Sequence, residues 1–146
     1  MKTIESQHWI ITLPDNWDKK ENDDQLYFEN SQNTMGLYIS TLSNNKNNKY
    51  ELIDIETFLK IDKEQLSIMK GYRFNILFEN ILKKQNLIFG ILDIYDPIKF
   101  YRIYVKYIAH GIICSRFSFH DYSYNEDSTS EQIKNLIIDS AKLKVS

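Results

Sequence analysis

The chain has few of the residues that build most cofactor and metal sites. Its 146 residues include one cysteine, three histidines, four glycines and two prolines. With so few glycines, the sequence contains neither a phosphate-binding loop nor a dinucleotide-binding fingerprint. Histidines 8, 110 and 120 lack the spacing of metal ligands, and a single cysteine cannot build a thiolate site or an internal disulfide. We therefore expect no cofactor, no metal and no catalytic residue.

Long apolar segments and a strong net charge are also missing. No stretch approaches the roughly 18 apolar residues of a transmembrane helix, and the first residues lack the apolar segment of a signal peptide. If the chain is complete, it is expected to be cytoplasmic, and the lone Cys114 agrees with a reducing compartment. The net charge of −2 gives no general attraction for nucleic acid or anionic lipid. We predict neither nucleic acid nor membrane as a partner.

What the sequence does have is a dense run of strand-forming residues between positions 72 and 120. Aromatic residues make up 14% of the chain and hydrophobic residues 42%. The run predicts four consecutive strands, separated by short turn-prone links, at residues 74–83, 87–95, 98–109 and 112–120. Because the links are short, neighbouring strands should pair antiparallel.

The third of these strands has the clearest alternation. One of its faces carries Tyr101, Ile103, Val105, Tyr107 and Ala109, and the other carries Phe100, Arg102, Tyr104 and Lys106. Such alternation predicts a sheet with one core face and one mixed, wetter face. Cations and aromatics on the mixed face could stack nucleic-acid bases, but no RNP-like motif accompanies them and the net charge does not favour nucleic acid, so a solvated or helix-covered sheet face is the expected explanation.

The rest of the chain predicts three more strands and two helices. The strands are expected at residues 8–13, 25–29 and 35–42. One helix should begin after Asp54 as N-cap and end before Gly71, and the other should begin near Ser128. We therefore predict a single α+β domain over residues 1–146, an antiparallel sheet of about six to seven strands with two helices packed on one face.

Three short segments resemble a known family. They are residues 9–17 (WIITLPDNW), 35–40 (MGLYIS) and 138–143 (IDSAKL). Together with the order of the elements, they resemble the PsbP-like superfamily, including its bacterial DcrB-like branch. The resemblance implies a PsbP-like α/β sandwich and a small, usually non-enzymatic binding domain that acts as an accessory, chaperone or inhibitor of other proteins. Unlike exported members, this chain has no signal peptide and no lipid-attachment cysteine near its start, which matches a cytosolic member better.

Two arrangements of reactive side chains have simpler explanations. Cys114 and His120 share a face of one predicted strand, but six residues of strand separate them by about 20 Å, too far for a nucleophile and its base. Asp93 and Asp96 could divide acid and base roles. They also stand where a hairpin turn favours aspartate.

The segment that best fits a binding role is the loop before the last helix. Its candidate partner-binding residues are Asp121, Tyr122, Tyr124, Glu126 and Asp127. Tyrosines can anchor a protein interface at low entropic cost, and the acids could face a basic partner. Alternatively, the tyrosines fold onto the core and Asp127 or Ser128 caps the helix.

The leading hypothesis is a non-enzymatic cytosolic protein-binding domain. Relatives in bacterial secretion systems escort or neutralise effector proteins, so the resemblance implies an immunity or effector-chaperone protein that masks a toxin or secreted effector. The alternative is a small enzyme or a small-ligand-binding domain with a pocket between helices and sheet. A third possibility is an oligomeric role in which edge strands pair two copies.

Overall fold

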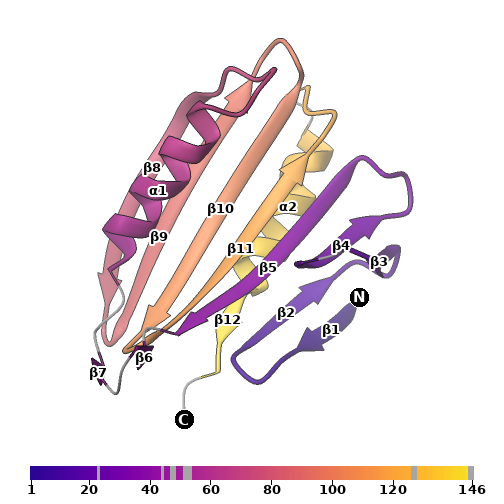
Figure 1. Ribbon diagram of the computed structural model, residues 1–146. Coiled ribbons are helices and arrows are strands. Elements are labelled where there is room, and N and C mark those ends of the chain that lie inside the picture. The colour runs from indigo at the N-terminus through magenta and orange to yellow at the C-terminus, as the bar shows by residue number, and fades with distance from the viewer. Residues whose placement is uncertain (23, 44, 47–48, 51–53, 126–127, 145–146) are drawn as a thin grey trace.

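The computed structural model is built around a seven-stranded antiparallel sheet (Figure 1). The structure describes residues 1–22, 24–43, 45–46, 49–50, 54–125 and 128–144. The strands of the large sheet lie in the order β3-β4-β5-β11-β10-β9-β8, and a smaller sheet has the order β1-β2-β12. The elements are β1 (Lys2–Glu5), β2 (Trp9–Leu13), β3 (Trp17–Lys20), β4 (Leu26–Asn30), β5 (Met35–Ser43), β6 (Asn45–Lys46), β7 (Lys49–Tyr50), α1 (Ile55–Ser67), β8 (Asn75–Lys84), β9 (Leu87–Asp96), β10 (Tyr101–His110), β11 (Ile113–Asp121), α2 (Ser128–Ser140) and β12 (Lys142–Leu143).

The predicted four-strand run is confirmed as β8 to β11. Each strand pairs antiparallel with its neighbour in sequence, as the short links predicted. Two of the links turn through residues in the left-handed region, Gln85 (φ 57°) and Gly111 (φ 61°). This backbone matches the right-handed twist of the flanking strands. The third strand begins at Tyr101 and not at Ile98, because the chain still turns through Phe100, whose φ is 54°.

The two helices lie on opposite faces of the large sheet. Helix α1 packs its Ile55 and Leu59 against β9, on the face of the sheet that also carries Ile103 and Val105 of β10; we call this the α1 face. Helix α2 packs against the other side, the α2 face, where Lys106 donates to the carbonyl of Ile138. The predicted α+β fold is confirmed, but the prediction that both helices pack on one face is wrong.

Strand β10 is buried on both sides as a result. The mixed face that the sequence predicted to be wetter is covered by α2 and by the small sheet, which lies on the same side. The core of the α2 face joins the small sheet, α2 and the large sheet, and its most buried members are Ile11, Leu13, Trp17, Leu37, Phe117, Phe119 and Ile137. Its side chains come from both ends of the chain, so the last helix and the first strands form one hydrophobic layer.

Charged side chains within the α2 face are paired. The guanidinium of Arg102 donates to both carboxylate oxygens of Asp93, at 2.9 and 2.7 Å, and also pairs with Glu131 of α2. Lys134 contacts Glu131 at 2.7 Å and stands over the ring of Tyr104 at 4.2 Å. A buried charge is tolerated only when it is paired in this way.

The strands that the sequence missed are short and polar. Strands β1 and β3 have four residues each, β6, β7 and β12 have two each, and β3 reads Trp17-Asp18-Lys19-Lys20. Only Trp17 of β3 is buried. Such segments carry too little alternation to be recognised as strands and form because a neighbouring strand offers them hydrogen bonds.

Helix α1 approaches the sheet closely at a glycine. Asp54 caps the helix as predicted, since its carboxylate accepts from the backbone and hydroxyl of Thr57. The helix ends at Ser67, one turn before Gly71. Where Ile55 meets β9, a Cβ on Gly90 would lie 2.6 Å from Ile55 Cγ2 and 3.2 Å from a ring carbon of Tyr107. The absence of a side chain at Gly90 therefore sets the distance between α1 and the sheet.

Replacing Gly90 with alanine is expected to lower the free energy of unfolding by about 1–3 kcal/mol, because the added methyl overpacks the contact with Ile55. Chemical denaturation of wild type, Gly90→Ala, Ile55→Ala and the double variant measures this. In the Ile55→Ala background, which removes Cγ2, the cost of Gly90→Ala should fall clearly below its cost in the wild type. Equal costs in the two backgrounds would contradict the close contact.

Candidate functional site

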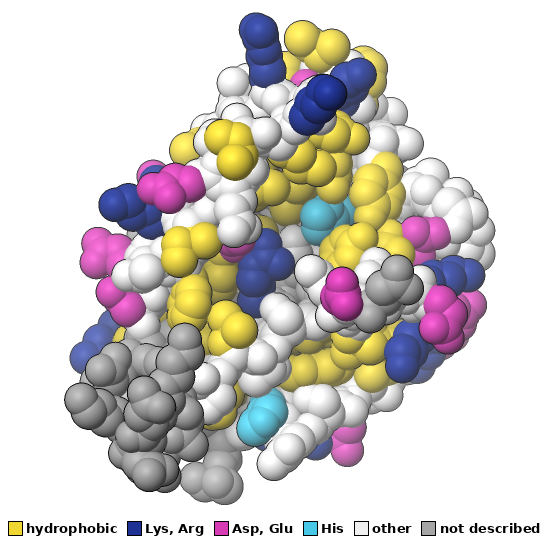
Figure 2. Space-filling view, viewed as in Figure 1, with side chains coloured by type: hydrophobic (Ala, Val, Ile, Leu, Met, Phe, Trp, Pro, Cys, Tyr) yellow, Lys and Arg dark blue, Asp and Glu magenta, His cyan; other side chains and the backbone are white. Residues whose placement is uncertain are grey.

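A group of aromatic side chains covers the part of the α1 face that α1 leaves open. Figure 1 shows α1 over β8 and β9, and no described helix lies over β10, β11 and β5 on this side. Figure 2 shows hydrophobic side chains gathered over the middle of the same side. We call this group the tyrosine face; its members are Tyr27, Tyr38, Tyr72, Phe74, Tyr101, His120 and Tyr122.

The rings of the tyrosine face form one connected network. Tyr27 packs on Tyr38 with 4.3 Å between ring centroids, and Tyr38 meets His120 edge to face at 5.0 Å. From His120 the contacts continue to Tyr101 at 5.8 Å and to Tyr122 at 6.0 Å. These are the distances at which aromatic pairs attract each other. Since most of the rings remain half-buried, the network presents apolar edges to solvent on a rigid support.

The register of the strands brings these residues together. Tyr27 on β4 stands opposite Tyr38 on β5, which stands opposite Ser118 on β11. Gly36 makes room for Tyr27, because a Cβ at this glycine would lie 2.2 Å from the Tyr27 hydroxyl. The network thus depends on pairings between strands that are far apart in sequence.

The phenols are held in their neutral form. The Tyr27 hydroxyl donates to Glu29 at 2.6 Å and lies 2.8 Å from the Tyr122 hydroxyl. Burial, followed by the hydrogen bond to Glu29, raises the pKa of Tyr27 far above its ordinary value. Burial also raises the pKa of Tyr122 to about 12. These tyrosines therefore act as hydrogen-bonding and apolar groups at neutral pH and carry no charge.

His120 is likewise held neutral. Its Nδ1 lies 2.5 Å from the Tyr101 hydroxyl and its Nε2 lies 2.9 Å from the Ser118 hydroxyl. Burial, with a smaller effect of nearby Arg116, lowers the pKa of His120 to about 3. Both ring nitrogens are used by hydroxyls, so His120 acts as a spacer within the network.

Arg116 adds one cation beside the aromatic network. Its Nε donates to the carboxylate of Asp62 on α1 at 2.9 Å, and its guanidinium lies 5.9 Å from the centre of the Tyr107 ring. The side chain keeps 23% of its surface exposed. Tyrosine and arginine are, with tryptophan, the residue types enriched at the energetically dominant positions of protein interfaces.

The predicted partner-binding residues do not form one group. Tyr122 is half-buried in the tyrosine face, whereas Tyr124 turns to the α2 face, where it packs on Arg102 at 4.8 Å and edge to face on Tyr95 at 5.0 Å. Asp121 is 3% exposed, and its carboxylate accepts from the backbone of Ser123.

The remaining two predicted residues, Glu126 and Asp127, lie outside the described part of the chain. The sequence thus identified one member of the tyrosine face, Tyr122. It missed Tyr27 and Tyr38, which no local motif marks.

The residues considered for the other candidate chemistries have separate roles in the structure. Cys114 is 1% exposed, burial raises the pKa of its thiol to about 12, and the hydrogen-bond partners of His120 are the hydroxyls described above. Asp93 is bound by Arg102, while Asp96 accepts from the amides of Ile98 and Lys99, as a turn aspartate would, and from the amide of Arg73 before β8. The basic-aromatic series of β10 lies under α2 from Arg102 onward.

Two further kinds of site are absent from the described residues. No group of three histidine, cysteine or acidic side chains is placed to hold a metal ion. No helix there is long and apolar enough to span a membrane.

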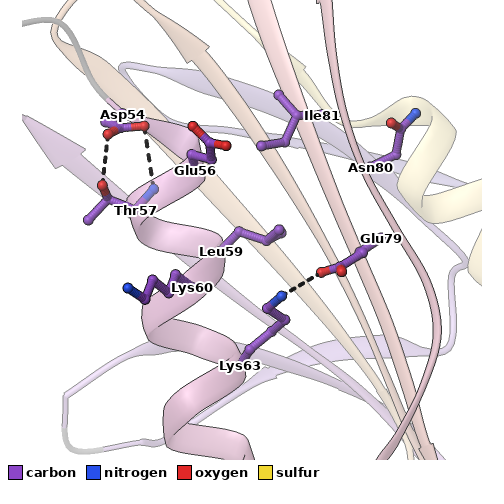
Figure 3. A pocket seen from close by; sticks show the side chains of 9 residues that line it. All are labelled: Asp54, Glu56, Thr57, Leu59, Lys60, Lys63, Glu79, Asn80 and Ile81. Atoms are coloured by element: carbon purple, nitrogen blue, oxygen red, sulfur yellow. Dashed lines mark hydrogen bonds and ion pairs between the residues drawn. The ribbon is translucent and has the colours of Figure 1, made fainter.

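A groove of about 670 Å³ lies between α1 and the edge strand β8 (Figure 3). Leu59 and Ile81 form apolar parts of its wall, and Lys63 of α1 reaches Glu79 of β8 at 2.9 Å across it. It is lined by Asp54, Glu56, Thr57, Leu59, Lys60, Lys63, Glu79, Asn80 and Ile81. Neither His120, Asp93 nor Cys114 lies in this groove.

Comparison with solved structures identifies proteins with a similar fold. A solution structure of the cyanobacterial PsbP protein CyanoP from Synechocystis sp. PCC 6803 matches with a TM-score of 0.75 over 98% of this chain and 92% of that chain, at 8% sequence identity. The chain has a PsbP-like fold. The crystal structure of the Saccharomyces cerevisiae Ran-binding protein Mog1p matches with a TM-score of 0.60 over 97% of this chain and 94% of that chain, at 12% identity. No protein-family model and no curated protein matches the sequence.

Acidification is expected to destabilise the protein through His120. The folded state keeps this imidazole neutral, whereas the unfolded chain takes up a proton below pH 6.5, so the free energy of unfolding should fall as pH falls. Between about pH 6 and pH 5, where the carboxylates are still mostly ionised, the slope should approach about 1.4 kcal/mol per pH unit.

Urea denaturation of wild type and His120→Gln at several pH values in this window measures the slope. Glutamine can hydrogen-bond but does not titrate, so its slope should be clearly smaller. Identical slopes for the two proteins would exclude His120 as the source.

Proposed function

We propose that this protein is a non-enzymatic binding domain and that the tyrosine face docks another protein. The observation that carries the proposal is the connected network of half-buried aromatic rings on a sheet face that no described helix covers. Tyrosine has only two side-chain torsions, so a ring that is already packed loses little further entropy when a partner covers it. Arg116, on the same face, supplies a cation that can pair with the partner.

The fold is compatible with this use. Mog1p, which is described as a Ran-binding protein, has a similar fold. At 12% identity it shares little of its surface with this chain, so the partner need not be related to Ran.

The more specific part of the proposal follows from the sequence. The segments at residues 9–17, 35–40 and 138–143 resemble the PsbP-like superfamily, including its bacterial DcrB-like branch, and relatives in bacterial secretion systems escort or neutralise effectors. We accordingly propose a cytosolic bacterial immunity or effector-chaperone protein that masks the surface of a toxin or secreted effector. The neutral phenols and the single arginine suit a mixed apolar and acidic patch on that partner.

A small-ligand or enzymatic role is supported less well. The groove between α1 and β8 has the volume of a ligand pocket, but it runs along the edge of the sheet and is rimmed by charged side chains. The candidate reactive side chains lie outside this groove: Cys114 is buried, and His120 is hydrogen-bonded between two hydroxyls.

Strand β5 offers a matched pair of variants to test the tyrosine face. Ser40 stands opposite Arg116 on the α1 face and is half-buried, while Ser43 is exposed at the end of the same strand with the opposite orientation. Ser40→Arg adds bulk and a second cation to the tyrosine face without removing a packed side chain. Ser43→Arg makes the same chemical change away from that face.

Affinity capture of tagged wild type and both variants from the native cells, followed by quantitative mass spectrometry, is the measurement. A stoichiometric partner should be recovered by wild type and by Ser43→Arg, and its recovery should fall about tenfold or more with Ser40→Arg. Circular dichroism and thermal melts confirm that both variants fold. A partner that both variants retain equally would rule out the tyrosine face, and no partner in any sample would contradict the binding role.

A further inference from the structure

Strand β8 is an edge strand whose ten residues are all exposed. Five of them are large apolar residues, and Phe78 and Leu82 on the α2 face expose 52% and 55% of their surface. The apolar members are Ile76, Leu77, Phe78, Ile81 and Leu82. An exposed apolar edge strand of this length is a template for pairing with another strand.

The opposite edge of the same sheet is built differently. Strand β3 has four residues, and three of these are the charged Asp18, Lys19 and Lys20. Shortness and charge are the usual protections of an edge against pairing. One edge of the sheet is therefore protected and the other is available.

We propose that two copies of this chain pair through β8, antiparallel about a two-fold axis at Ile81, so that the two large sheets become one. The register follows from an irregularity in β8. Its pairing with β9 shifts between Ile76 and Phe78, which leaves seven regularly paired residues from Phe78 to Lys84. Antiparallel pairing of this whole segment with its own copy is centred on its middle residue, Ile81.

The charges of β8 are complementary in this register. Glu79 of one copy stands opposite Lys83 of the second copy, and the two-fold axis repeats the pair. Ile81 stands opposite Ile81 of the second copy, in the middle of the α1 face of the joined strands. On the other face, Phe78 stands opposite Lys84 of the second copy, whose methylene stem can pack along the ring. Shifting the centre by one residue, to Asn80, loses both charge pairs.

The helices leave room for this pairing. Helix α1 lies over β8 and β9 and makes most of its contacts with β9, so the axes of the two α1 helices would stand between two and three strand spacings apart, about 10–14 Å. This separation accommodates two helices with a diameter of about 10 Å each. Both helices would lie on the same face of the joined sheet, and the two grooves beside β8 would open toward each other with Ile81 at their shared floor.

This inference is independent of the proposed function, because it uses the sheet edge and not the tyrosine face. A single pair of seven-residue segments makes a smaller interface than the standard size of about 1,600 Å². We therefore expect a reversible dimer with a dissociation constant in the micromolar range.

Sedimentation equilibrium of the purified protein, from about 1 to about 300 µM, tests the dimer without any other partner. Ile81→Lys, which places two ammonium groups at the two-fold axis, should weaken dimerisation at least about tenfold. Ile68→Lys makes the same change at an isoleucine that is 81% exposed at the end of α1, and should leave dimerisation unchanged.

Charge reversal tests the register. Lys83→Glu places glutamates opposite each other twice and should weaken the dimer about tenfold, and adding Glu79→Lys in the double variant should restore it to near the wild-type value. A monomer at every concentration would overturn the proposal. The remaining pairing partner for β8 would then be a strand from a different protein. A dimer that Ile81→Lys does not weaken would overturn it as well, since that dimer would form elsewhere.

Discussion

Strand β10 has no side that faces water, and this constraint decides where the rest of the chain lies. Its odd-numbered residues enter the core of the α1 face, while Arg102 and Lys106 enter the opposite side. A cation that leaves water needs acceptors, and α2 supplies them. Glu131 at the start of α2 pairs with Arg102, and the carbonyls of Ile138 and Ala141 at its end accept hydrogen bonds from Lys106. The two ends of α2 are thus fixed over β10 by two cations of one strand.

The sequence predicted the parts of the fold that depend on local pattern. The boundaries of β8 to β11 were correct to within three residues, because strong alternation and turn residues mark them. The prediction of the sheet face on which α2 packs was wrong, because Arg102 and Lys106 in a strand look like residues of a solvent-exposed face until their partners are known. Asp93 lies in the neighbouring strand, but Glu131 lies 29 residues away from Arg102, and nothing local connects the two.

The tyrosine face was predictable only in part, for a similar reason. Tyr122 was recognised because it stands in a polar loop close to another tyrosine. Tyr27 and Tyr38 come from strands that also contribute to the opposite core, so their alternation looks like that of any half-buried strand. Solved structures with this fold are 8% and 12% identical to the chain, so the surface chemistry described above belongs to this sequence and not to the fold.

The pairing of β2 with β12 bears on how the protein folds during synthesis. Strand β2 pairs with β1, which precedes it, and with β12, which comes about 130 residues later, where Lys144 also donates its amide to the carbonyl of His8. A chain emerging from the ribosome can close the local hairpins β8–β9 and β10–β11 as soon as they leave the exit tunnel. Residues 9–13 must wait until α2 and β12 have followed, because their core is shared with Ile137 and Ile138. Residues 9–13 are therefore secured later than strands that are made after them, and a nascent chain exposes their apolar side chains to chaperones until α2 and β12 have been made.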